Sequence, residues 1–180
     1  MADALIIVDY QHDFAHPDGA LSVPAGHEVA EHINALAASG DYELVIATRD
    51  WHPPDHGSFT EQGGIWPVHC VQGSAGAELH LALDREPIHA IVDKGQDAGT
   101  EGYSAFDATS LAETLRARGI DSVTIVGLAT DYCVKNTALD ALREGFAVRI
   151  DRAGVRGVDV EPGDSERALD ELAAAGATVA

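Results

Sequence analysis

The chain has 180 residues, 46% of them hydrophobic, and its 11 basic and 30 acidic residues leave a formal net charge of −19. This length suits one domain with a sizeable core, so we expect a single domain over residues 1–180. The negative charge repels phosphate and anionic lipid, and no apolar run approaches the roughly 18 residues of a membrane span. We therefore expect neither a nucleic-acid partner nor a membrane partner.

Strands and helices are predicted to alternate along the chain. Short apolar, often β-branched runs predict strands at 4–8, 43–48, 88–93, 123–126, 147–150 and 177–179. Helical spacing of apolar residues predicts helices at 26–38, 110–118, 132–144 and 164–174. This alternation with apolar strands predicts an α/β fold of three layers, α/β/α, around a six-stranded, mainly parallel sheet.

Polar residues stand at the ends of the first four predicted strands. Asp9, Asp50 and Lys94 lie directly after the first three strands or within two residues of their ends, and the fourth leads into the turn before Cys133. Carboxyl ends of parallel strands meet at one edge of a sheet, where ligands bind. One aspartate there is ordinary turn chemistry, but four such strand ends predict a functional site.

Cys133 lies at the predicted start of a helix, after a tight turn of small residues. Helix N-termini carry partial positive charge and unpaired N–H groups, so we expect a lowered thiol pKa and a place for an oxyanion. Asp9 could take the thiol proton and Lys94 could stabilise the thiolate. Asp131 is a candidate N-cap for this helix. A small packed thiol and an Asp–Lys ion pair at the sheet rim are the structural alternatives.

The long loop after the second predicted strand is rich in potential metal ligands. Asp50 and His52 alternate, so an extended chain points both side chains the same way, and His56 and His69 follow in the same loop. One carboxylate with two or three imidazoles suits a divalent first-row metal such as zinc, iron or manganese. Cys70 directly follows His69, but neighbours in an extended chain point in opposite directions, so we expect a packed thiol.

Six segments together resemble the nicotinamidases, also called pyrazinamidases, of the isochorismatase-like cysteine hydrolases. They are DYQHDF (9–14), TRDWHPPDHGSF (48–59), WPVHCVQGSAGAELH (66–80), DKG (93–95), EGYSAF (101–106) and GLATDYCVKNTALDALREG (127–145). The match runs in order along nearly the whole chain. It implies an isochorismatase-like, Rossmann-like fold and hydrolysis of nicotinamide, and also of pyrazinamide, to the acid and ammonia through a thioester.

The resemblance also implies a role for individual residues. The catalytic triad corresponds to Asp9, Lys94 and Cys133. The ligands of one divalent metal per chain, zinc first with iron or manganese as alternatives, correspond to Asp50, His52 and His69, with His56 as an extra ligand in some members. The walls that hold the pyridine ring correspond to Phe14, Trp66 and Tyr103. A cis Leu128–Ala129 bond is also implied, with the N–H groups of Ala129 and Cys133 as the oxyanion hole.

Two other kinds of function remain open at this level. One keeps the fold but changes the substrate, as in an isochorismatase that cleaves a vinyl ether or in a carbamoyl amidohydrolase. The complete Asp-x-His plus His set favours nicotinamide over both, because relatives with other substrates usually lack it. The other is a metal-binding protein without catalysis, against which the intact Asp9, Lys94 and Cys133 argue.

A cytoplasmic location is predicted from the N-terminus and the cysteines. The N-terminal residues have no basic region before their short apolar stretch, unlike a signal peptide. Two cysteines make no disulfide framework, which suits a reducing compartment. The expected partner is the small-molecule substrate, and the oligomeric state is left open. The excess of acidic residues is equally consistent with a saline habitat and with a GC-rich genome.

Overall fold

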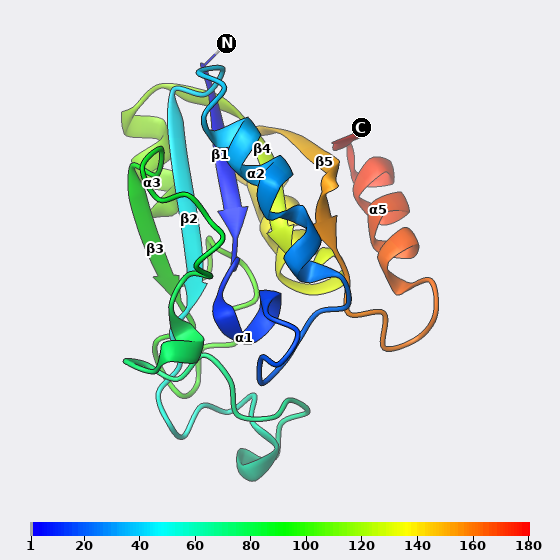
Figure 1. Cartoon of the computed structure of the whole chain (residues 1–180). Coiled ribbons are helices and arrows are strands. Elements are labelled where there is room, and N and C mark those ends of the chain that lie inside the picture. The colour runs from blue at the N-terminus through cyan, green and yellow to red at the C-terminus, as the bar shows by residue number, and fades with distance from the viewer. Residues whose placement is uncertain (1) are drawn as a thin grey trace.

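The computed structural model describes residues 2–180, and its centre is a six-stranded sheet (Figure 1). The strands are β1 (Ala2–Val8), β2 (Leu44–Asp50), β3 (Ala90–Lys94), β4 (Ile120–Leu128), β5 (Ala147–Arg156) and β6 (Thr178–Val179). Their order is β3-β2-β1-β4-β5-β6, and every neighbouring pair is parallel. The predicted six-stranded α/β fold is confirmed, with a sheet that is wholly parallel.

Helices cover both faces of this sheet. They are α1 (His12–Ala15), α2 (Ala30–Ala37), α3 (Leu111–Ala117), α4 (Lys135–Arg143) and α5 (Asp164–Ala175). Successive residues of β1 point to opposite faces: Leu5 and Ile7 belong to the core under α2, and Ile6 and Val8 to the core under α3, α4 and α5. Burial on both faces explains why the strands read as continuous apolar runs.

The element boundaries differ from the predicted ones at the edge that carries the polar residues. The strand predicted at 123–126 continues through Gly127 and Leu128, because these two residues pair with Val155 and Arg156 of β5 after a register shift. Gly127 has φ +110°, and a Cβ there would lie 2.1 Å from the carbonyl oxygen of Val8. A glycine is therefore required where β4 passes the end of β1.

Two short helical segments also depart from the prediction. The helix expected at 26–38 begins with a 3-10 turn, Gly26–Val29, and only then becomes α2. The four residues of α1 were not predicted, because so short a helix leaves no apolar period to detect. Two further 3-10 turns, Thr60–Gln62 and Ala75–Ala77, lie in the long connection between β2 and β3.

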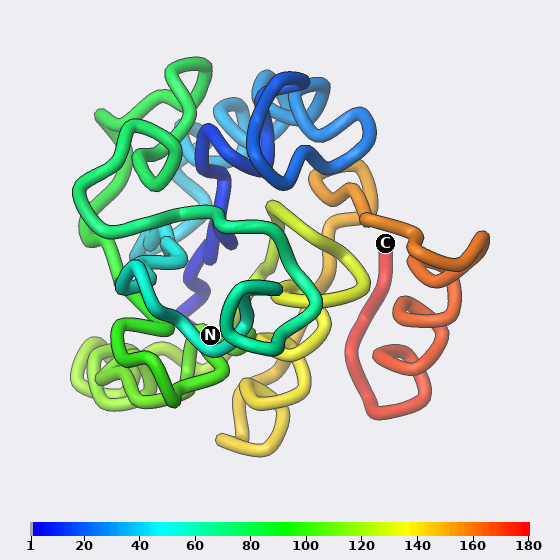
Figure 2. The backbone as a smooth tube through the Cα atoms, turned by 90° about the horizontal axis from the view of Figure 1, so that it is seen from below, coloured from blue at the N-terminus to red at the C-terminus, as the bar shows by residue number. Residues whose placement is uncertain are grey.

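The carboxyl ends of the strands carry the long connections. In Figure 1 the arrows of β1, β2 and β3 point downward, and the segment after β2 lies below them. Seen from below, this segment runs across the end of the sheet (Figure 2). Within residues 2–180, no helix combines the length and the apolar character needed to cross a membrane.

Candidate active site

The turn that carries Cys133 connects β4 to α4. It begins with a cis peptide bond between Leu128 and Ala129, the bond implied by the resemblance. Residues Thr130–Val134 then form a single π-helical turn that leads into α4. Such turns are often found at functional sites. Cys133 therefore lies at a helix start beyond the carboxyl end of a strand, as the sequence predicts.

Asp131 does not cap this helix as predicted. Its side chain makes no capping hydrogen bond; its carboxylate instead accepts backbone N–H groups from Val158 at 2.9 Å and Asp159 at 2.8 Å. The segment after β5 thus offers donors that compete with the helix N-terminus. Asp131 fastens that segment to the turn that carries Cys133.

Lys94 is the cation at the centre of the site, with a side chain fully shielded from solvent. Its Nζ lies 2.8 Å from Oδ2 of Asp9 and 2.6 Å from Oδ1 of Asp50. It also donates to the Gly102 carbonyl at 2.6 Å and lies 3.5 Å from Sγ of Cys133. Burial opposes its charge, but the two carboxylates outweigh burial and hold the pKa of Lys94 well above its usual value.

Asp9 follows β1 in a left-handed backbone conformation, with φ +48°, and is completely buried. Its Oδ1 accepts the hydroxyl of Thr48 at 2.6 Å, and its Oδ2 faces Lys94 in an ion pair. Burial raises the pKa of Asp9, and Lys94 opposes this rise. A carboxylate with a raised pKa is a better proton acceptor, so Asp9 is suited to the role of base.

The thiol of Cys133 does not have the lowered pKa that its helix position predicts. Burial raises the pKa of Cys133 well above its usual value, and Lys94 opposes this effect. The raised pKa favours the neutral thiol. Transfer of its proton to Asp9 would move a negative charge within the buried cluster rather than create one, which would avoid much of the cost of burial.

Asp50, His52 and His69 come together on the other side of Lys94. Oδ2 of Asp50 lies 3.4 Å from Nε2 of His52 and 3.9 Å from Nε2 of His69. The Nδ1 atoms of the two histidines face the carbonyl oxygens of Gly95 at 2.8 Å and Pro67 at 2.7 Å. A carbonyl only accepts, so each Nδ1 carries a proton, and Nε2 is the nitrogen that each ring turns toward Asp50.

The charges of this cluster suit a divalent cation. Burial opposes the ionisation of Asp50, but Lys94 and the two histidines hold its pKa well below the usual range. Burial lowers the pKa of His69, which favours the neutral imidazole that a metal requires, whereas the hydrogen bond and charge of Asp50 raise the pKa of His52 against the effect of burial. Candidate ligand atoms of Asp50, His52 and His69 all lie within 4.8 Å of one another. One carboxylate and two imidazoles fit zinc, iron or manganese.

The structure does not bring His56 into this set of donors. Its Nδ1 lies 2.7 Å from the Ser58 hydroxyl and its Nε2 lies 2.8 Å from the Thr100 carbonyl, so both nitrogens have partners elsewhere. The ring instead stacks on His52, with 3.8 Å between ring centroids. His56 therefore packs against the ring of His52 and does not take the position of a fourth ligand that the resemblance implies.

A pocket joins the thiol to the candidate metal ligands. Cys133, Asp50, His52 and His69 line it together with the three aromatic residues that the resemblance places around a ring, Phe14, Trp66 and Tyr103. Trp66 donates its indole N–H to the hydroxyl of Tyr103 at 2.9 Å, which fixes that wall. Cys70 lies outside this lining, buried in the core as expected.

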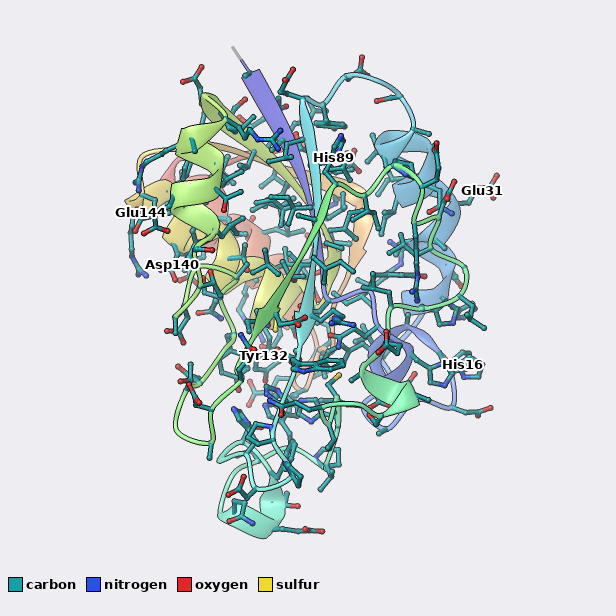
Figure 3. The ribbon with its side chains drawn as sticks, turned by 90° about the vertical axis from the view of Figure 1, so that its left-hand side faces the viewer. His16, Glu31, His89, Tyr132, Asp140 and Glu144 are labelled. Carbon is teal, nitrogen blue, oxygen red and sulfur yellow. The ribbon has the colours of Figure 1, made fainter. Side chains whose placement is uncertain are left out.

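Three residues of the site were missed by the sequence reasoning. Thr48 holds Asp9, and Gln11 clamps Asp50 by accepting its N–H and donating to its carbonyl, both at 2.8 Å. Tyr132 lines the pocket and packs edge-on against Trp66, and Figure 3 shows it at the lower ends of the strands. Their proximity to Asp9, Asp50 and Cys133 in the chain was the available signal.

Comparison with known proteins agrees with this geometry. The Isochorismatase domain model matches residues 3–180. The chain is 43% identical to the nicotinamidase of Escherichia coli (strain K12) over 199 residues, covering 98% of this chain and 93% of that protein. It also matches the structure of PnC1 from L. infantum in complex with nicotinate, with a TM-score of 0.95, 38% identity and coverage of 99% and 92%.

A second solved structure extends the likeness to a metal-bound protein. The pyrazinamidase of Pyrococcus horikoshii in complex with zinc has a TM-score of 0.92 and 44% identity, covering 100% of this chain and 99% of that one. The family model and these relatives span almost every residue of the chain, and the fold and the order of the site residues are those implied by the resemblance. The protein therefore belongs to the isochorismatase domain family.

Proposed function

We propose that the protein is a nicotinamidase, a metal-dependent cysteine amidohydrolase that converts nicotinamide to nicotinate and ammonia and also accepts pyrazinamide. The observation that carries this proposal is the single pocket in which the thiol of Cys133, beside Lys94, faces the donors Asp50, His52 and His69. Similarity to a nicotinamidase, to a nicotinate complex and to a zinc-bound pyrazinamidase supports the choice of substrate.

The proposed reaction proceeds through a thioester. Asp9 takes the proton of Cys133, and the sulfur attacks the carboxamide carbon while the N–H groups of Ala129 and Cys133 hold the oxyanion. The C–N bond then breaks, and Asp9 returns the proton to the leaving ammonia. Water hydrolyses the thioester to nicotinate and restores the thiol. Lys94 stabilises the negative charge as it moves between Asp9 and Cys133.

The metal is proposed to be held by Asp50, His52 and His69. Zinc is supported by the Pyrococcus horikoshii structure, and iron and manganese suit the same donors. A divalent ion held there would supply a Lewis acid for the pyridine nitrogen, and this would orient the ring and withdraw electrons from the carboxamide. Phe14, Trp66 and Tyr103 are the proposed walls for the ring.

The other functions left open by the sequence explain this site less completely. Isochorismatase and carbamoyl amidohydrolase activity would not call for the complete Asp-x-His plus His set that the pocket contains. A non-catalytic metal-binding protein would not call for the Asp9, Lys94 and Cys133 cluster. A cytoplasmic location and a single domain over residues 1–180 stay predictions alongside the proposed activity.

The first test is ammonia release from nicotinamide by the purified protein. We expect release by the metal-loaded protein, its loss after chelation and its return when zinc is restored, because the metal orients the ring. Pyrazinamide should be hydrolysed in the same way. Metal-loaded protein that releases no ammonia from either amide would reassign the site to another substrate of the same family.

The ligand set is tested by metal content, measured by elemental analysis after dialysis. We expect His69→Ala to lower metal affinity by more than about 100-fold, because it removes a donor, and the chain to be isolated largely without metal. His56→Ala is the matched control: it removes a neighbouring imidazole with no nitrogen directed at Asp50, and should retain one ion per chain. Metal loss in His56→Ala alone would reverse the assignment of these two histidines.

A further inference from the structure

Thr48 makes two hydrogen bonds to one residue, Asp9. Its hydroxyl accepts the backbone N–H of Asp9 at 3.2 Å and donates to Oδ1 of the same residue at 2.6 Å. The direction is unambiguous, because a backbone N–H only donates and leaves the hydroxyl proton for the carboxylate. Thr48 is completely buried in β2, beside the end of β1. One hydroxyl thus fixes both the main chain and the side chain of Asp9.

This arrangement makes the two carboxylate oxygens of Asp9 different. Oδ1 already accepts a short, charge-assisted hydrogen bond from Thr48, so it could take a proton only by losing that bond. Oδ2 is directed at Lys94, 2.8 Å from Nζ, and within the described residues it has no well-aligned hydrogen-bond donor. Lys94 in turn lies 3.5 Å from Sγ of Cys133. A carboxylate oxygen of Asp9 lies within 4.8 Å of Sγ of Cys133, and Oδ2 is the oxygen left free to take a proton.

The backbone conformation of Asp9 makes the hydrogen bonds from Thr48 more important. Its φ of +48° lies in the left-handed region, which is uncommon for residues other than glycine and persists where the surroundings fix it. A carboxylate on this turn without a partner for Oδ1 would be free to rotate about its Cβ–Cγ bond. Rotation would move Oδ2 away from the thiol, and small errors in such positions slow proton transfer.

We propose that Thr48 is a positioning residue for the reaction: by binding Oδ1 of Asp9 it reserves Oδ2 as the oxygen that takes the Cys133 proton. This inference rests on the proposed function, in which Asp9 is the base. It predicts that the hydroxyl matters and that the methyl group does not. It also predicts an effect on the chemical step and not on the metal or on substrate binding.

The test compares Thr48→Val, which keeps the shape but removes the hydroxyl, with Thr48→Ser, which keeps the hydroxyl. We expect kcat for nicotinamide to fall about 10-fold to 100-fold in Thr48→Val, with KM within about twofold and one metal ion per chain. Thr48→Ser should restore kcat to within about threefold of the original protein. Thr48→Ala removes the same hydroxyl and takes the place of Thr48→Val if that variant does not fold.

Thr124→Val is a matched control. Thr124 is also a buried strand threonine that donates to an aspartate, Asp3, at 3.2 Å, but it lies toward the opposite end of the sheet. The kcat and KM of Thr124→Val should equal those of the original protein. Unchanged kcat in both Thr48→Val and Thr48→Ala, equal losses in Thr48→Ser and Thr48→Val, or loss of metal together with kcat would each overturn the proposal.

A readout without nicotinamide separates this proposal from the proposed function. The rate at which iodoacetamide alkylates Cys133, followed by mass spectrometry, depends on proton removal from the thiol whatever the natural substrate is. We expect this rate to fall in Thr48→Val by a factor similar to that for kcat and to recover in Thr48→Ser. A protein inactive on nicotinamide that still shows this series would keep the role of Thr48 and lose only the substrate.

Discussion

The two cysteines of the chain are both buried, yet their surroundings differ in charge. Cys133 lines the pocket and is 6% exposed, whereas Cys70 is fully enclosed in the core. Burial raises the pKa of both thiols well above the usual value. For Cys133 the next largest effect is the opposing charge of Lys94. For Cys70 the next largest effects come from aspartates that raise the pKa further, ahead of a smaller opposing effect of Lys94. A cation and a base, more than depth, distinguish the proposed nucleophile.

An aspartate also stabilises the backbone near each cysteine, but the two aspartates have different roles. Asp13 accepts the N–H of Cys70 at 2.8 Å and thereby fixes a residue whose own φ is +47°. Asp131 accepts two N–H groups from the segment after β5 and so connects the turn of Cys133 to a wall of the pocket. One aspartate stabilises a packed loop, and the other joins two parts of the site.

The largest predicted difference between the two cysteines is in catalysis. Cys133→Ala should lower kcat for nicotinamide by at least about 1000-fold, because it removes the group that forms the thioester. Cys70→Ala should leave kcat within about twofold, since Cys70 does not line the pocket. Ammonia release under saturating nicotinamide measures both variants.

Activity retained in Cys133→Ala would rule out the mechanism in which a cysteine is the nucleophile. Ammonia release by Cys133→Ala at the original rate would mean that the proton acceptor and the metal ligands act on water directly. A large loss in Cys70→Ala, with metal content unchanged, would mean that the segment around His69 depends on the packed thiol. Metal content is therefore measured for both variants alongside the rate.

Much of the fold could be predicted because its signals are local. Runs such as residues 4–8 and 123–126 are apolar on both faces of a strand, which is typical of a covered parallel sheet. The same logic brought Asp9, Asp50, Lys94 and Cys133 to one edge, since the carboxyl ends of parallel strands meet there. The structure places Asp9, Asp50 and Cys133 in contact or near contact with Lys94.

The features that could not be predicted depend on contacts between distant segments. The partners of His56 are Ser58 and the Thr100 carbonyl, and the second of these lies 44 residues away in the chain. Asp131 finds its donors beyond β5, and so cannot be recognised as anything but a helix cap from its neighbours. The thiol pKa of Cys133 is set by burial, which a helix-terminus argument does not include.

The smallest predicted difference between the two cysteines is in stability. Here the substitution of Cys70, not that of Cys133, has the larger effect. Cys70→Ala should lower the free energy of unfolding by about 1–2 kcal/mol, because it leaves a cavity in a close-packed core. Cys133→Ala should change it by less than about 0.5 kcal/mol or raise it slightly, because its sulfur borders the pocket and a charged cluster.

Urea unfolding measures this difference, and both variants should be compared after chelation, because a metal bound only to the folded protein would mask an effect of this size. Equal losses in the two variants would show that both thiols serve packing, and would weaken the contrast between them. A loss confined to Cys70→Ala, beside a catalytic loss confined to Cys133→Ala, would show that one buried thiol contributes to stability and the other to chemistry. That separation is what the position of Lys94 predicts, since its Nζ lies 3.5 Å from the sulfur of Cys133, whereas the charge effects of aspartates on Cys70 exceed that of Lys94.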